Sequence, residues 1–373
     1  MKVNIQSVGI HRMNYPHTIL EILSEYKKEK VLDKDYIIPW QSAEANGMPA
    51  LVHMLIDTKV PDSIQTRLKV EMKGMPLTFT ASPDGDTIKV LSLTGQGEKD
   101  RDLITASYLN DEGKEIPIGF LNLISYKKQE LKLVIVPVDG EFKYNVSALQ
   151  KFLNQVYAPA ITTWEVSLAT EKLDVEYDEG EKNGLNTSRS FLSSFNKEMN
   201  AIIEAMKARS EYSADKNTYY LFVMDKAEKE SLNGLMPFSS NFGFIFTGDG
   251  PDEIKLFRTM AHELGHGAFK LNHIFDDKGT QKQATLNLMD YTTAPEKAIV
   301  LHKYQWDDII DPRLIAFGWS EELYEEVEQI QTWDVFNISD KFKAEIEGYL
   351  RSLYYTDLGR VMVETQYFAS CYK

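Results

Sequence analysis

The stretch FRTMAHELGHGAFKLNHIF, residues 257–275, decides how this chain is interpreted. Pro251-Asp252-Glu253 ahead of it is typical of a helix start, where the macrodipole favours acids. Residues four apart on a helix lie about 40° apart around the axis and about 6 Å apart along it, so the His262 and His266 imidazoles can converge on one ion. Glu263 is rotated to the side, where it can act as a base on a water beside the ion. The pattern predicts a hydrolytic metal centre on a helix.

A third metal ligand is needed, because a catalytic zinc usually takes three protein ligands and leaves one position open. His273 is the leading candidate in the sequence. On a continuing helix it would lie about 16 Å along the axis from His262, so the helix has to end and turn back. Gly267 weakens the helix, and Asn272 tolerates the left-handed conformation that would reverse the chain.

Other interpretations of these residues stay open. The two motif histidines could lie on the surface or in the core of an ordinary helix, and His273 could cap a helix or pack in a core. Oxygen atoms of Asp276 or Asp277 are then the alternative ligands, with Glu296 further along the chain. A site built on several thiolates and an intrachain disulfide are both excluded, because Cys371 is the only cysteine.

Strands and helices alternate ahead of the motif. LKLVIVPV, residues 131–138, is a continuous apolar run typical of a strand that is covered on both faces. The elements expected after it are a helix at 145–157, a strand at 162–169, a helix at 190–209, a strand at 218–225 and the strand FGFIFTG at 242–248. With the motif helix, this order indicates a mostly parallel sheet with helices against it and with FGFIFTG at its edge.

The first part of the chain has shorter, alternating apolar runs, at 67–72, 76–81 and 87–93. The turn sequence Pro83-Asp84-Gly85-Asp86 predicts a hairpin between the last two runs. We expect a mostly β domain of the sandwich type here, with one helix near residues 16–30.

The change of pattern divides the chain into three parts. They are a mostly β domain over 1–128, the α/β domain that carries the motif over 129–312, and a helical C-terminal extension over 313–373. The fold class is therefore α+β, with more than one domain. The extension, with acidic helices expected at 320–331 and 340–355, is interpreted as a solvated face over a modest core contact. The alternative is that it covers the cleft and keeps the protein latent.

Composition narrows the classes of partner. The net charge is −15, with 56 acidic residues against 41 basic ones, which argues against binding nucleic acid or an anionic membrane. We expect no membrane insertion, because no run is long and apolar enough to span a bilayer. The first residues do not form a secretory signal. A cytoplasmic protein, a secreted one written without its leader and an effector exported without a leader all fit, so the localisation stays open.

HELGHGAFKLNH, followed by Met289 in NLMDY, resembles the metzincin zinc peptidases, with their extended histidine motif and downstream Met-turn. More narrowly, these segments and the following KYQWD at 303–307 are similar to metallopeptidase domains of bacterial polymorphic toxins and related secreted proteins. The resemblance covers about residues 129–312, and it favours a secreted or exported bacterial protein. It implies a twisted mixed sheet, an active-site helix and a Met-turn.

The resemblance also implies roles for individual residues. Three histidines would bind Zn²⁺, namely His262, His266 and His273. Glu263 would be the catalytic base, Met289 the Met-turn residue beneath the zinc, and Tyr291 a residue that approaches the metal or the oxyanion. The plainer alternatives are a core methionine at 289 and a half-buried packing tyrosine at 291. The chain departs from H-E-x-x-H-x-x-G-x-x-H by one extra residue before the third histidine and by Phe269 at the glycine position, so its turn must be built differently.

These observations predict a zinc-dependent endopeptidase that hydrolyses a peptide or protein substrate with a metal-activated water and Glu263 as general base. The resemblance implies that an extended substrate pairs with the edge strand, for which FGFIFTG is the candidate. Two alternatives stay open. One is a zinc amidase acting on a non-protein substrate, and the other is a catalytically silent binding module with a structural zinc site.

Overall fold

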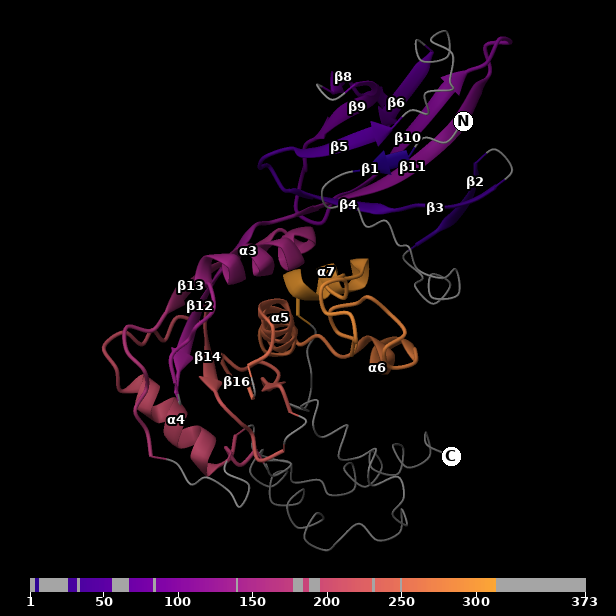
Figure 1. Cartoon of the computed structure of the whole chain (residues 1–373). Coiled ribbons are helices and arrows are strands. Elements are labelled where there is room, and N and C mark those ends of the chain that lie inside the picture. Colours follow the sequence, from indigo (N-terminus) through magenta and orange to yellow (C-terminus); the bar gives the residue numbers. More distant parts are fainter. Residues whose placement is uncertain are drawn as a thin grey trace, which may run out of the picture.

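The computed structural model describes residues 4–6, 26–31, 34–55, 67–82, 85–138, 140–176, 184–187, 195–229, 232–248 and 250–312. The extension expected over 313–373 lies outside these residues, as does most of the helix expected near 16–30. The described end of that helix is instead strand β2 (Lys28–Val31), because it pairs antiparallel with β3 (Lys34–Ile37). Sheets and helices occur together (Figure 1), which confirms the α+β class.

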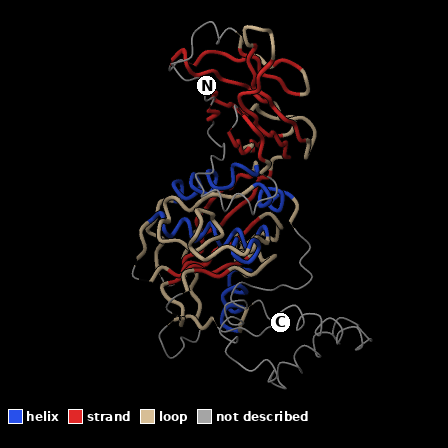
Figure 2. The backbone as a smooth tube through the Cα atoms, turned by 90° about the vertical axis from the view of Figure 1, so that its right-hand side faces the viewer, coloured by secondary structure: helices blue, strands red, loops and turns tan. Residues whose placement is uncertain are grey.

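The N-terminal part is built from strands, as Figure 2 shows at the top of the molecule. One sheet has the order β1 (Asn4–Gln6), β5 (Ala50–Leu55), β9 (Gly85–Leu93) and β8 (Phe79–Ser82). The other has the order β4 (Trp40–Glu44), β11 (Glu115–Tyr126), β10 (Arg101–Leu109), β6 (Leu68–Met72) and β7 (Met75–Pro76). Strands β8 and β9 pair antiparallel, so the expected hairpin is confirmed. Buried side chains of both sheets, Val52 and Leu121 among them, share one hydrophobic cluster.

A second five-stranded sheet begins immediately after this part. Its order is β13 (Thr162–Leu168), β12 (Gln129–Pro137), β14 (Thr218–Met224), β16 (Phe242–Phe246) and β15 (Gly234–Leu235). The first four strands are parallel and β15 runs antiparallel to β16, so the expected mostly parallel sheet is confirmed. The expectation that residues 242–248 form the edge strand is wrong, because β15 pairs along the outer side of β16.

Helices cover both faces of this sheet, and the apolar strands alternate their side chains between them (Figure 1). On one face, Leu133 and Ile245 pack with α3 (Val146–Tyr157) and α5 (Glu253–Phe269). On the other face, Phe222 and Phe244 pack with α4 (Lys197–Lys207). The remaining helical elements are η1 (Ala158–Ala160), α6 (Ile274–Lys278) and α7 (Lys303–Ile310).

Helix α5 runs through the interior and carries the motif. Its N-terminus is capped by Asp252, whose side chain accepts a hydrogen bond from the Lys255 N–H at 2.8 Å, as expected for an acidic helix start. Most of its residues from Leu256 to Phe269 are buried, which explains why its sequence is largely apolar. Over the stretches that the structure describes, neither α5 nor any other helix has the length and apolarity needed to cross a bilayer.

Candidate metal centre

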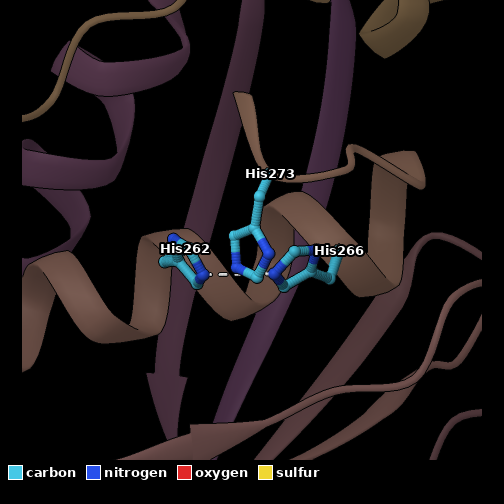
Figure 3. Close-up of side chains that lie close together, drawn as sticks. All are labelled: His262, His266 and His273. Atoms are coloured by element: carbon cyan, nitrogen blue, oxygen red, sulfur yellow. Dashed lines mark hydrogen bonds between the residues drawn. The ribbon is translucent and has the colours of Figure 1, made fainter. Parts of the chain in front are cut away.

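Two histidines of α5 point to one place, because they are four residues apart on the same helix face. The side chains of His262 and His266 are 6% and 1% exposed. Their Nε2 atoms lie 3.1 Å apart, the contact drawn as a dashed line in Figure 3. The motif helix therefore brings the two imidazoles together as the sequence predicts.

The helix ends one turn after His266, by a turn that differs from the expected one. Lys270 adopts the left-handed conformation with φ 57°, and the Leu271 N–H reaches back to the Gly265 carbonyl oxygen at 3.0 Å. The expectation that Asn272 reverses the chain is therefore wrong. Gly267 does not end the helix either; a Cβ at that position would lie 2.4 Å from the Met236 Sδ, so this glycine is needed for close packing.

The turn returns the chain over the helix and places His273 at the start of α6. Figure 3 shows its imidazole pointing toward the other two rings. One ligand atom from each of His262, His266 and His273 lies within 4.8 Å of the others, and all three residues are buried. This cluster could hold a metal ion.

Hydrogen bonds fix which nitrogen of each ring can bind a metal. The His262 Nδ1 lies 2.8 Å from the Leu288 carbonyl oxygen, and the His266 Nδ1 lies 2.6 Å from the Leu271 carbonyl oxygen. A carbonyl only accepts, so both Nδ1 atoms carry the proton and both Nε2 atoms keep their lone pair. The His273 Nδ1 lies 3.3 Å from the Asp276 Oδ2, which favours the same tautomer. Such outer partners are usual for metal-bound histidines.

The separation of the two α5 nitrogens is compatible with a shared metal ion such as zinc. Two nitrogens that are each about 2.0–2.1 Å from a tetrahedral zinc lie about 3.3–3.4 Å apart, close to the observed separation of 3.1 Å between the His262 and His266 Nε2 atoms. The alternative oxygen ligands lie elsewhere. Asp276 contacts the Nδ1 atom of His273, on the side of that ring away from Nε2. Asp277 accepts a hydrogen bond from the Asn272 side chain at 3.0 Å, and Glu296 is exposed.

The side chain of Glu263 extends from α5 toward β15 at the edge of the sheet. Its side chain is 4% exposed, and it approaches the backbone of β15 so closely that a Cβ at Gly234 would lie 2.7 Å from its Cγ and 2.8 Å from its Oε1. A residue larger than glycine at 234 would have to displace the carboxylate. Within the sheet β13-β12-β14-β16-β15, β15 is the strand that the sequence pattern missed, and it is the strand that borders Glu263.

Met289 packs against α5 at Gly265 and is fully buried. A Cβ on Gly265 would lie 2.7 Å from the Met289 Sδ, so the glycine between the two motif histidines is what admits this side chain. The backbone of Met289 also accepts a hydrogen bond from Ile274, next to His273, at 3.0 Å. The turn at 287–291 therefore supports both the helix and the returning chain.

Tyr291 packs beside the third histidine. Its ring centroid is 5.1 Å from that of His273 and 5.3 Å from that of Phe275, which itself stacks on His273 at 4.6 Å. This position fits both the expected approach to the metal and the alternative of a half-buried packing residue, so the role of Tyr291 stays a prediction.

Arg258 is a site residue that the sequence analysis missed. It lies one turn before His262, is 8% exposed, and donates from Nε to the Ala298 carbonyl oxygen and from Nη2 to the carbonyl oxygens of Leu288 and Asp290. Burial lowers its pKa to about 10, so it is charged at neutral pH. The Leu288 carbonyl thus accepts from both Arg258 and His262. An arginine four residues before a motif histidine, on the apolar face of a helix, was the signal available in the sequence.

Tyr157 of α3 also holds α5 next to the first motif histidine. Its hydroxyl donates to the Ala261 carbonyl oxygen at 2.6 Å, next to His262. Burial, and after it the charge of Glu263, raises the pKa of Tyr157 well above its usual value, so the hydroxyl keeps its proton as a donor.

Comparisons with known proteins do not show which family this chain belongs to. No family model and no curated protein sequence matches the chain. CopC from Methylosinus trichosporium OB3b is 11% identical over 23% of this chain and 85% of its own, with a TM-score of 0.17. A 2,6-sialyltransferase from Photobacterium sp. JT-ISH-224 is 7% identical over 50% of this chain and 35% of its own, with a TM-score of 0.20. A polysaccharide deacetylase from Bacillus cereus is 11% identical over 84% of this chain and 80% of its own, with a TM-score of 0.15. These similarities are too weak to carry an argument, so the resemblance to metzincins rests on the residues alone.

Proposed function

We propose that this chain is a zinc-dependent endopeptidase. The observation that carries the proposal is the buried cluster of His262, His266 and His273, whose ligand atoms lie within 4.8 Å of one another beside a buried glutamate. Three nitrogen ligands with one open position are the usual donor set of a catalytic zinc, whereas structural zinc sites usually have four protein ligands. In the residues that the structure describes, the cluster has three histidines and no fourth ligand. The donor set therefore favours catalysis over a purely structural site.

The three histidines would hold the zinc through Nε2, with their Nδ1 atoms held by the oxygen acceptors described above. The zinc would supply Lewis acidity, which polarises the scissile carbonyl and makes a water nucleophilic near neutral pH. Glu263 takes a proton from the attacking water as the new C–O bond forms, and it delivers that proton to the amine nitrogen as the C–N bond breaks. Tyr291 is the candidate hydrogen-bond donor to the negative charge that develops on the carbonyl oxygen.

The substrate of this proposal is an extended peptide that lies along β15. Within the described part of the chain β15 ends its sheet, so its outer backbone groups are placed for pairing with an added strand. The close approach of Gly234 to Glu263 would bring the backbone of such a peptide next to the base. This arrangement favours a peptide over a small amide, for which a closed pocket is expected.

Cleavage of a mixed peptide library tests the proposal. The zinc-loaded full chain is compared with Glu263→Gln, which keeps the size of the side chain beside Gly234 but removes the base, and with a chelated sample. A matched control is Glu296→Gln, because Glu296 is exposed. We expect cleavage by the wild type and the control, and none by Glu263→Gln or the chelated protein, while Glu263→Gln still holds one zinc.

Two results would overturn the proposal. Unchanged cleavage by a zinc-loaded Glu263→Gln protein contradicts the role of the base. A wild-type protein that holds one zinc but cleaves no peptide points instead to a non-protein amide substrate or to a binding role.

A further inference from the structure

Helix α7 lies between the N-terminal strands and α5 (Figure 1), and one of its faces carries a buried lysine. The Lys303 side chain is 1% exposed and forms an ion pair with Asp307 one turn later. Its Nζ lies 5.0 Å from the centroid of the Trp40 ring and 5.7 Å from that of the Tyr126 ring. Both aromatic residues belong to the N-terminal strands β4 and β11, so the ammonium group is held at the junction of the two parts of the chain.

The ion pair is itself bound to the N-terminal part. The Tyr126 hydroxyl donates to the Asp307 Oδ1 at 2.7 Å, and the Arg101 Nη2 lies 3.7 Å from the Asp307 Oδ2. The Lys303 backbone N–H donates to the Tyr26 hydroxyl at 3.1 Å. Burial, followed by the charge of Asp307, raises the pKa of Tyr126, so this hydroxyl remains a donor. A buried charge without such partners would be costly, which makes the position of α7 specific.

The same helix is joined to the metal centre. The side-chain amides of Gln305 and Asn287 exchange two hydrogen bonds, of 2.7 and 3.1 Å. The Asn287 Oδ1 also accepts from the Met289 N–H at 2.8 Å. Residues 288 and 289 then provide the carbonyl oxygens that hold His262 and the chain beside His273. A continuous set of contacts thus leads from Trp40 through α7 to two of the three histidines.

We propose that the N-terminal strands act as a positioning module for the metal centre, in which Lys303 is the positioning residue that fixes α7 and, through Gln305 and Asn287, the turn that orients His262 and His273. The proposal rests on the metal centre but not on peptide hydrolysis. It gives the N-terminal β part a role that requires no ligand of its own. Outer contacts of this kind determine how tightly a metal is bound.

The test is the zinc affinity of the full chain, measured by competition with a chromophoric chelator, together with the visible spectrum of the cobalt-substituted protein. Lys303→Met replaces lysine by another unbranched side chain that has no charge. Asp307 keeps its contacts with Tyr126 and Arg101 in this variant. We expect zinc binding about 3- to 30-fold weaker and a changed cobalt spectrum. The matched control is Lys99→Met, which removes an exposed ion pair with Asp311 at the same junction and should bind zinc as the wild type does.

A double-mutant cycle separates coupling from general damage. Gln305→Met breaks the link to Asn287 and should weaken zinc binding about 10- to 100-fold. In that background Lys303→Met should have little further effect, because its route to the metal is already cut. Additive effects, or wild-type affinity and cobalt spectrum in a folded Lys303→Met protein, overturn the proposal.

If Lys303→Met does not fold, Trp40→Phe replaces it in the cycle. This variant shortens the aromatic surface that contacts Lys303, and the same results are expected. A wild-type chain that binds no zinc overturns the metal centre and this proposal with it.

Discussion

The histidine cluster draws on two parts of the chain that position their side chains by different means. Helix α5 carries two of the histidines, and the segment that follows it, residues 271–302, carries the third. In α5, the spacing of His262 and His266 is a property of the helix itself, and the carbonyl oxygens of Leu288 and Leu271 orient the two rings. The segment 271–302 contains one described helix, the five-residue α6, and is otherwise irregular. Two candidate ligands are therefore placed locally, and the third depends on contacts between distant parts of the chain.

Buried polar groups take over the role of regular hydrogen bonding in the irregular segment. Asp290 is fully buried, and its carboxylate accepts from the backbone N–H groups of Gln283 and Thr285, both at 2.9 Å, and from the Thr285 hydroxyl at 2.7 Å. Arg258 binds the same segment from the helix side. One pair of histidines in the cluster is thus positioned by a helix and the third histidine by a network of buried polar groups, so the two parts should respond differently to mutation.

The largest expected effect tests whether both parts supply ligands. His266→Ala and His273→Ala each remove one nitrogen of three, and we expect the zinc affinity to fall on the order of 100- to 1,000-fold in each. Competition titration measures the affinity, with Glu263→Gln as a control that binds zinc normally. If His273→Ala binds zinc as tightly as the wild type, the irregular segment does not supply a ligand.

The next effect concerns the arginine that joins the two parts. Arg258→Met leaves three buried carbonyl oxygens without their charged donor, so we expect the free energy of unfolding to fall by about 3–5 kcal/mol and the zinc affinity to fall about 10- to 100-fold. Urea unfolding and metal titration measure the two quantities. Arg209→Met is the control, because Arg209 also donates to two carbonyl oxygens, those of Glu171 and Lys172, but away from the site. It should reduce stability without weakening zinc binding; equal loss of affinity in both variants contradicts the role of Arg258.

A smaller effect tests the contact between α5 and the turn beneath it. Glycine to alanine within a helix ordinarily stabilises by about 1 kcal/mol. In Gly265→Ala the new methyl group would meet the Met289 Sδ at 2.7 Å, so we expect the free energy of unfolding to fall by roughly 1–3 kcal/mol instead. The loss should shrink when Met289→Ala is present as well. A stabilised Gly265→Ala protein would show that the two parts are not in close contact.

The smallest effect concerns the residue at which the helix gives way to the irregular segment. Lys270 has φ 57°, a conformation that is unfavourable for residues other than glycine. We expect Lys270→Gly to raise the free energy of unfolding by up to about 1 kcal/mol, measured by urea titration, with zinc affinity unchanged. Asn272→Gly is the matched comparison and should not raise the free energy of unfolding. A protein stabilised by Asn272→Gly but not by Lys270→Gly would contradict the assigned turn.

The sequence alone was enough to predict the helix-borne part. The apolar spacing, the acids at Asp252 and Glu253 and the four-residue separation of the histidines are all local signals, and the parallel sheet follows from the order of apolar runs. The turn was not predictable in detail, since lysine at 270 has no preference for the left-handed conformation. The close packing of Gly267 against Met236 was not predictable either, because it is a tertiary contact.

The edge strand β15 was not predicted from the sequence for a different reason. Strand β15 has only two residues, Gly234 and Leu235, which is too short to give a periodic signal. Its identity as the strand next to Glu263 depends on pairing with β16 and on the absence of a side chain at Gly234. The link between NLMDY and KYQWD, carried by Asn287 and Gln305, was visible only as two neighbouring motifs.

X-ray absorption spectroscopy of the zinc-loaded full chain tests the central claim most directly, because it counts and identifies the ligands of the metal. We expect three imidazole nitrogens at about 2.0–2.1 Å and one further light ligand in the wild type, with one imidazole fewer in His273→Ala. A zinc bound by two imidazoles in the wild type, with the same spectrum in His273→Ala, would contradict the joint site formed by α5 and residues 271–302.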